Sequence, residues 1–229
     1  MSTHQHLTAS AGYDTSSPDA ISQGRTTIIA VALGLAAAAE AAVLLWNPWP
    51  ARDDLSYDAV APVRDDTWLG ITIDALGFGT MAVMLGLAVC VLVRARGSRW
   101  ANAGAVLASL GGVLYAMGAF AFAAFSWYAT ETEAISAKTG TALMEHAEDN
   151  PEHILLPQMA GFLLFTVGSV LLSVALLRAR SVPLWIPAGV LLLTVGTFLP
   201  VPSRALDLVQ AALMAVLIVL AWTAGRHQQ

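Results

Sequence analysis

The sequence predicts an all-α fold, a polytopic bundle of six membrane-spanning helices. Its 229 residues are 57% hydrophobic and only 12% charged, with a mean hydropathy of +0.66, which is far more apolar than an ordinary soluble domain. The apolar residues fall into six runs, each near the ~20 residues that a helix needs to cross the hydrocarbon core of a bilayer. The six runs are residues 27–46, 68–93, 101–128, 154–177, 184–199 and 205–222.

The segments outside these runs are predicted to be tails and loops. Residues 1–24 are rich in Ser, Thr, Gly and His and have no apolar period, which is typical of a disordered tail. The first apolar run is long enough to span a bilayer, so we expect a membrane helix there rather than a cleaved signal. Residues 25–226 are then the transmembrane domain, and residues 227–229 are a short C-terminal tail. The fifth run is short and bracketed by Pro183 and Pro200, which marks its ends but not its tilt.

The distribution of arginine predicts the orientation of the helices. If the six runs alternate in direction, one side of the membrane receives a set of arginines while the opposite loops, 47–67 and 130–153, are rich in Asp and Glu. The positive-inside rule makes the arginine side cytoplasmic. Both termini are therefore expected in the cytoplasm, with the chain in the plasma membrane. The arginines on that side are Arg25, Arg94, Arg96, Arg99, Arg178, Arg180 and Arg226.

Two stretches of the chain are similar to each other. The sequence "LVRARGSRWANAGAVLASLGG" from Leu92 aligns with "LLRARSVPLWIPAGVLLLTVGT" from Leu176. A parallel internal repeat, in which the second and third helices recur as the fourth and fifth, is one interpretation. Chance similarity between helices rich in Leu, Ala and Gly is the other. The sequence leaves both interpretations open.

Three acidic residues lie within the apolar runs: Glu40, Asp74 and Asp207. Glu40 and Asp74 are each six residues from a tryptophan at the end of their run, which places both roughly 9 Å below the same interface. A charge facing lipid costs at least a few kcal/mol, so we expect all three to face the interior of the bundle, where the protonated form is favoured. They are candidate proton donors and acceptors. The alternatives are neutral acids that only form hydrogen bonds between helices and, for Asp207, an ion pair with Arg204, which we favour for that residue.

Aromatic residues lie at a depth similar to that of the acids. Aromatic faces attract positive charge without acting as nucleophiles, so they suit a cationic ligand or a carbocation. Packing and anchoring at the membrane interface is the alternative role. A second pattern on the third run, glycine at positions 104, 111 and 118, predicts close packing between helices. The candidate substrate-binding aromatics are Trp68, Tyr115, Phe122, Phe125, Trp127, Phe162 and Phe165.

Several classes of function are excluded or disfavoured. The net charge is −5 and no block rich in Lys or Arg exists, so nucleic acid is not an expected partner. His146 and His153 share the loop 130–153 with several acids, but their spacing matches no metal motif, and a solvated acidic loop is favoured. Hydrolase, metalloprotease and nucleotide-binding motifs do not occur in the sequence. No metal or other cofactor is expected.

The layout resembles known groups of membrane proteins. With "LLWNPW", the acidic loop 47–67, "RARGSRWANAGAVLASLGG" and "LLRARSVPLWIPAGVLL", it looks like small actinobacterial multi-pass proteins of largely unassigned function. The three acids make it similar also to the small membrane-bound terpene cyclases of meroterpenoid and indole-sesquiterpenoid pathways. That resemblance implies Glu40, Asp74 and Asp207 as acid and base positions, and an isomerase or lyase type of activity on a prenylated substrate dissolved in the bilayer.

Two other classes of function stay open. In a proton-coupled transporter or resistance protein, the same acids would bind a cationic or lipophilic ligand. In a structural or immunity protein, the acids would only pack. The partners expected in the first two cases are a lipophilic small molecule and membrane lipids, and the oligomeric state is undetermined.

The predicted orientation can be tested by cysteine labelling. In a background in which the single Cys90 is replaced by Ser, Ser56→Cys should react with a membrane-impermeant thiol reagent in intact cells. Ser98→Cys should react only after the cells are opened, because positive-inside topology places it in the cytoplasm. Equal labelling of the two variants in intact cells would show that the orientation is wrong.

Overall fold

A computed structural model describes residues 18–47, 56–93, 98–199 and 202–226. This part of the chain consists of helices and contains no strand. Five segments are long and apolar enough to cross a membrane, and a sixth apolar helix is shorter. The predicted all-helical bundle is thus confirmed for the described residues. Residues 1–17 of the predicted tail 1–24, and the predicted tail 227–229, lie outside them.

Six helices correspond to the six apolar runs, with bounds that differ by a few residues. They are α1 (Pro18–Trp46), α3 (Arg64–Val93), α4 (Ser98–Ala129), α6 (Glu152–Ala179), α7 (Trp185–Gly196) and α8 (Ser203–Arg226). The largest difference is at α1, which begins at Pro18 although residues 1–24 are predicted to be a tail. Proline fits the first position of a helix because no intrahelical acceptor exists there for its missing N–H.

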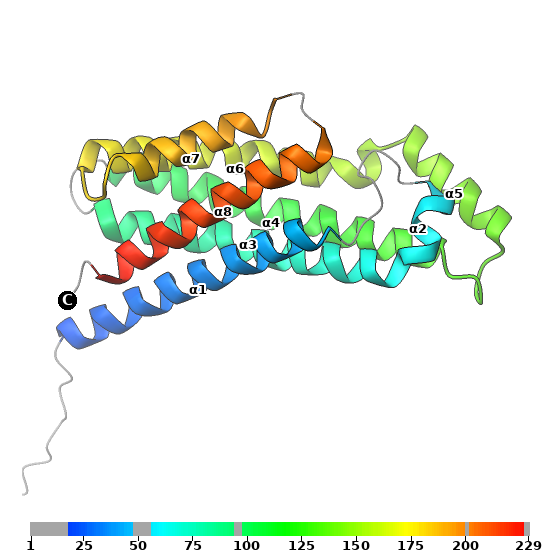
Figure 1. Cartoon of the computed structure of the whole chain (residues 1–229), viewed down its shortest axis with the longest axis horizontal. Helices are drawn as coiled ribbons and strands as arrows, with labels where there is room; N and C mark the ends of the chain where they lie inside the picture. Colours follow the sequence, from blue (N-terminus) through cyan, green and yellow to red (C-terminus); the bar gives the residue numbers. More distant parts are fainter. Residues whose placement is uncertain (1–17, 48–55, 94–97, 200–201, 227–229) are drawn as a thin grey trace, which may run out of the picture.

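The six helices form a closed ring. Each packs against the next in the order α1, α3, α4, α6, α7 and α8, and α8 returns to pack along α1 (Figure 1). Many large apolar side chains on the outside of this ring are exposed, among them Leu35, Val106 and Leu192. Such a surface is costly in water and suits contact with lipid.

Short helices lie together at one end of the ring, opposite the end of α8 (Figure 1). They are α2 (Tyr57–Val60), the 3-10 helix η1 (Ala61–Val63) and α5 (Ala137–Asp149). Tyr57, Val60, Ala129 and Met144 form a small separate core there. The end is also held by Arg64, whose guanidinium lies 3.0 Å from the Glu131 carboxylate. We refer to α2, η1 and α5 together as the cap.

Glycines set the distance between α4 and α6. The three glycines at seven-residue spacing on α4 face α6: Gly104 lies against Gly168, Gly111 against Gly161 and Phe165, and Gly118 against Gln158. A methyl group at Gly104 would lie 2.9 Å from the Gly168 carbonyl oxygen, and one at Gly111 would lie 2.6 Å from the Gly161 carbonyl oxygen. The close packing predicted from the glycine pattern is therefore confirmed, with α6 as the partner.

Gly111→Ala should lower stability by about 1–3 kcal/mol, because the new methyl group meets backbone atoms that cannot rotate away. The measurement is the thermal unfolding midpoint in detergent, followed by circular dichroism. Gly189→Ala is the matched control, since a methyl group there would lie 3.6 Å from Val216, an ordinary contact. Equal midpoints for both variants and the wild type would contradict the role assigned to the α4–α6 contact.

Candidate functional site

A cavity of about 450 Å³ lies inside the ring of helices, within the range of roughly 300–1,000 Å³ found for small-molecule sites. All six ring helices contribute to its wall, and most of the lining side chains are apolar or aromatic. The lining residues are Glu40, Leu44, Thr67, Ile71, Asp74, Phe78, Tyr115, Phe122, Leu155, Gln158, Met159, Phe162, Phe165, Thr166, Thr194, Thr197, Gln210, Leu213 and Met214.

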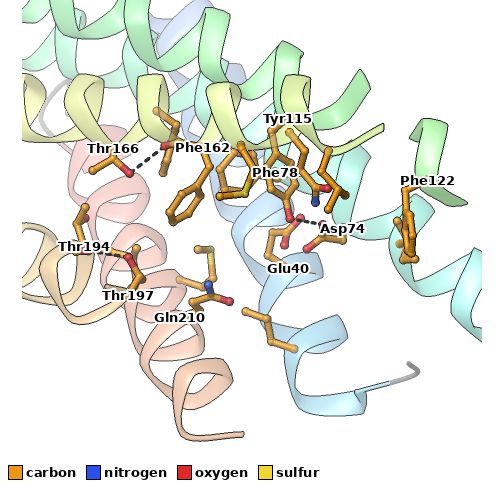
Figure 2. A pocket seen from close by; sticks show the side chains of 18 of the residues that line it. Glu40, Asp74, Phe78, Tyr115, Phe122, Phe162, Thr166, Thr194, Thr197 and Gln210 are labelled. Atoms are coloured by element: carbon orange, nitrogen blue, oxygen red, sulfur yellow. Dashed lines mark hydrogen bonds between the residues drawn. The ribbon is translucent and has the colours of Figure 1, made fainter. Parts of the chain in front are cut away.

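Two of the three predicted acids meet at this cavity. Glu40 on α1 is 2% exposed and Asp74 on α3 is 8% exposed, and both line the wall. Figure 2 shows their carboxyl groups beside each other. The expectation that these acids face the interior of the bundle is confirmed.

Gly77 explains how the two carboxyl groups come so close. It lies one helical turn after Asp74, on the same face of α3, and the Glu40 side chain fills the space that a side chain at Gly77 would take. A methyl group at this position would collide with the Glu40 carboxyl group and lie 3.1 Å from its Cδ. The absence of a side chain at Gly77 therefore lets Glu40 of α1 reach across to α3.

Tyr115 of α4 joins the two acids. Its hydroxyl donates a hydrogen bond of 2.9 Å to Asp74 Oδ2, and it lies close enough to both carboxyl groups to interact with them electrostatically. The Tyr115 ring packs on Phe78 with 4.1 Å between centroids, and Phe78 packs on Phe165 at 4.7 Å. The phenol is thus fixed both by its hydrogen bond and by its ring contacts. We call Glu40, Asp74 and Tyr115 the acidic wall of the cavity.

Asp207, the third predicted acid, lies elsewhere. It is 3% exposed but does not belong to the cavity lining. Its Oδ2 is 3.9 Å from the Arg204 guanidinium. Arg204 in turn donates to the backbone carbonyls of Leu44 at 3.0 Å and Leu45 at 3.3 Å, in the last turn of α1. This contact ties α8 to the end of α1, and Asp207 supports it through Arg204.

The predicted aromatic set is divided by the structure. Tyr115, Phe122, Phe162 and Phe165 line the cavity, whereas Trp68, Phe125 and Trp127 do not. Phe125 packs against the small core of the cap. Trp127 donates a hydrogen bond of 2.8 Å to Asp65, and Trp68 is 43% exposed. These three contribute at the cap end and on the surface rather than at the cavity.

Several lining residues were not among the candidates from the sequence. Phe78 could have been found, since it follows Asp74 by four residues and therefore lies on the same helix face. Thr194, Thr197 and Gln210 carried no such signal, because single neutral polar residues in an apolar helix are common. Thr194 of α7 and Thr197 directly after it lie away from the acidic wall, and Gln210 of α8 is drawn between them and Glu40 (Figure 2).

The loop histidines lie on or beside surface helices. His146 is in α5 and contacts Asn150, and His153 at the start of α6 lies 3.3 Å from Glu152. Among the described residues, no three His, Cys, Asp or Glu side chains come together in a way that could hold a metal ion. The polar groups that line the cavity are carboxyl, phenol, hydroxyl and amide groups.

Tyr115→Phe should lower stability by about 0.5–1.5 kcal/mol, because Asp74 loses a hydrogen-bond donor inside an apolar bundle. The ring contacts with Phe78 remain, so the loss reports on the hydroxyl. Tyr128→Phe is the control, since Tyr128 is 65% exposed and its variant should match the wild type. Thermal unfolding in detergent measures both, and an unchanged midpoint for Tyr115→Phe would contradict a stabilising bond.

Comparisons with known proteins return no relative: no protein-family model, no curated protein and no solved structure matches this chain. The case for a function therefore comes from the cavity and its residues.

Proposed function

We propose that the chain is an integral membrane enzyme that cyclises a prenylated, lipid-soluble substrate by protonating it. The observation that carries the proposal is the acidic wall, in which Glu40 lies beside an Asp74 that accepts a hydrogen bond from Tyr115. The cavity behind it has a size suited to a small molecule and a wall rich in phenyl rings. Two carboxyl groups that differ in their surroundings are what acid and base chemistry on one substrate requires.

The proposed reaction is an isomerisation without a redox step. A carboxylic acid gives its proton to a terminal epoxide or alkene, and the carbon that becomes positive is attacked by a second double bond, so that a carbon–carbon bond closes a ring. A second carboxylate then takes a proton from the carbon next to the final cation. Phe78, Phe162 and Phe165 line the cavity, and their rings would stabilise the positive charge of the intermediates.

The hydrogen bond from Tyr115 supports one assignment of the two roles. A hydroxyl that donates to a carboxyl oxygen stabilises the charged form of that group. Asp74 is therefore the acceptor of the last proton, and Glu40 is the donor of the first. Asp207 supports the end of α1 through Arg204 and takes no part in the proton transfers.

The proposal includes the membrane setting. The five long helices and α7 each cross the plasma membrane. The N- and C-termini then lie in the cytoplasm, and the cap lies on the outer face of the membrane. In this arrangement, the substrate enters from the bilayer and the acidic wall lies in the outer leaflet. A parallel repeat of α3 and α4 in α6 and α7 would account for the two similar "RAR" segments.

Proton-coupled binding or transport of a lipophilic cation is the second candidate. The observation in its favour is the charge of the cavity lining, whose described residues include two carboxyl groups and no Lys, Arg or His. Phenyl rings and carboxylates together are a common site for an organic cation. In this case, Glu40 and Asp74 would exchange a proton for the ligand, and no product would form.

Glu40→Gln and Asp74→Asn should each reduce product formation by about 100-fold or more, since an amide keeps the size of the acid but cannot transfer a proton in this way. The variants are expressed in a host that makes prenylated substrates, and cyclic products are measured against the amount of protein in the membrane. A role limited to packing predicts a small effect instead, because an amide replaces a neutral acid at a cost of about 1 kcal/mol or less.

Asp207→Asn is the comparison variant, because this acid is as buried as the other two but lies outside the cavity lining. It should keep far more activity than the other two amides, with a loss that follows its lower stability. Near-wild-type turnover in both Glu40→Gln and Asp74→Asn would overturn the cyclase proposal. No cyclic product in the wild type, together with drug tolerance that depends on Glu40, would favour transport.

A further inference from the structure

The cavity has a second polar group that the proposed reaction does not use. Its members are Thr194 on α7, Thr197 directly after α7, and Gln210 on α8. Figure 2 shows Thr194 and Thr197 on the side away from Glu40 and Asp74, with Gln210 drawn between them and Glu40. The cavity therefore has polar side chains away from the acidic wall as well as on it, and Thr67, Gln158 and Thr166 also line it.

The Thr194 hydroxyl is the informative member of this group. The residue is 4% exposed, and among the described residues its Oγ1 has no hydrogen-bond partner. The neighbouring threonines differ: Thr197 donates to the Thr194 carbonyl at 2.7 Å, and Thr166 donates to the Phe162 carbonyl at 2.9 Å. A hydroxyl in a helix usually finds such a carbonyl, and a buried one without a partner is destabilising. The oxygen itself is buried, so a ligand oxygen in the cavity would supply the partner after the Thr194 side chain turns about χ1 and exchanges its hydroxyl and methyl positions.

The charges of the lining restrict what this ligand group can be. Thr194, Thr197 and Gln210 are neutral, and among the described lining residues the acids are Glu40 and Asp74. In the same set no cationic side chain is present to balance a phosphate, a diphosphate or a carboxylate, and an Asp74 carboxylate would repel these anions. A hydroxyl or carbonyl oxygen fits, since Thr and Gln side chains both donate and accept hydrogen bonds.

We propose that the cavity binds an elongated neutral isoprenoid with an oxygen function at the end distant from the acidic wall, and that Thr194 and Gln210 hold this hydroxyl or carbonyl group. The identity of the other end, an epoxide or alkene beside Glu40, rests on the proposed function. The oxygen end determines which substrates enter and in which direction they lie. Prenyl diphosphates and plain hydrocarbons are thereby disfavoured as ligands.

The experiment compares two probes of one carbon skeleton, farnesol and the corresponding hydrocarbon without the hydroxyl. Binding to the full chain is measured in lipid nanodiscs as a function of the mole fraction of probe in the lipid. The signal is either the recovery of tryptophan fluorescence that brominated lipid has quenched or the shift in the thermal unfolding midpoint of the protein. The wild type should prefer farnesol by about 3- to 10-fold, the equivalent of one net hydrogen bond. Thr194→Val should abolish this preference without lowering stability, because valine keeps the shape and removes an unpartnered polar group.

Thr166→Val is the matched control. Thr166 lines the same cavity, but its hydroxyl is already bonded to the Phe162 carbonyl, so this variant should keep the preference for farnesol. Gln210→Leu should reduce the preference as Thr194→Val does. Equal binding of the two probes by the wild type would overturn the inference, as would an equal loss of preference in Thr166→Val and Thr194→Val.

The binding test is independent of turnover. Glu40→Gln should still prefer farnesol over the hydrocarbon, because the oxygen end is held by Thr194 and Gln210. If the wild type forms no cyclic product but shows a Thr194-dependent preference, the proposed function fails while the oxygen site stands. If product forms but the probes bind equally, the proposed function stands and the oxygen site fails.

Discussion

The contact between α4 and α6 is the constraint on which the site depends. Their glycines bring the two backbones together, and the same glycines lie beside the residues that matter: Gly161 lies against the backbone of Tyr115, and Gly111 against that of Phe165. Phe78 of α3 then packs on both of these rings. Because the close backbone contact fixes the position of Tyr115, its hydroxyl is held within hydrogen-bonding distance of Asp74 and donates to that carboxyl group. The acidic wall is thus fixed by small residues that carry no functional group.

The cavity exists on the side where packing is looser. On α3, α4 and α6, glycine and alanine allow close approach, whereas α7 is a helix of only 12 residues that meets its neighbours α6 and α8 far less extensively than α4 meets α6. Side chains therefore do not fill the centre of the ring on this side, and the cavity remains between the helices. Two threonines and a glutamine line this space on the α7 and α8 side, and two carboxyl groups line it on the α1 and α3 side, so the two sides differ in chemistry.

The sequence predicts the parts of this structure that depend on local pattern. The apolar runs give the six ring helices to within a few residues at most ends, and the glycine spacing on α4 gives a close contact. The burial of Glu40 and Asp74 follows from the cost of a charge in lipid. What pattern does not give is which faces meet across the ring. Trp127 and Phe122 look alike in sequence, yet one binds Asp65 at the cap and the other lines the cavity. Thr194 is recognised as a candidate site residue only once the structure shows that it lines the cavity.

Arg204 has a consequence for how the chain is completed during synthesis. It satisfies two carbonyls at the end of α1 from a position 160 and 159 residues further along the chain. Those carbonyls belong to the last turn of a helix, where no intrahelical donor exists for them. The end of α1 therefore obtains these donors only after α8 has been synthesised and has packed against it.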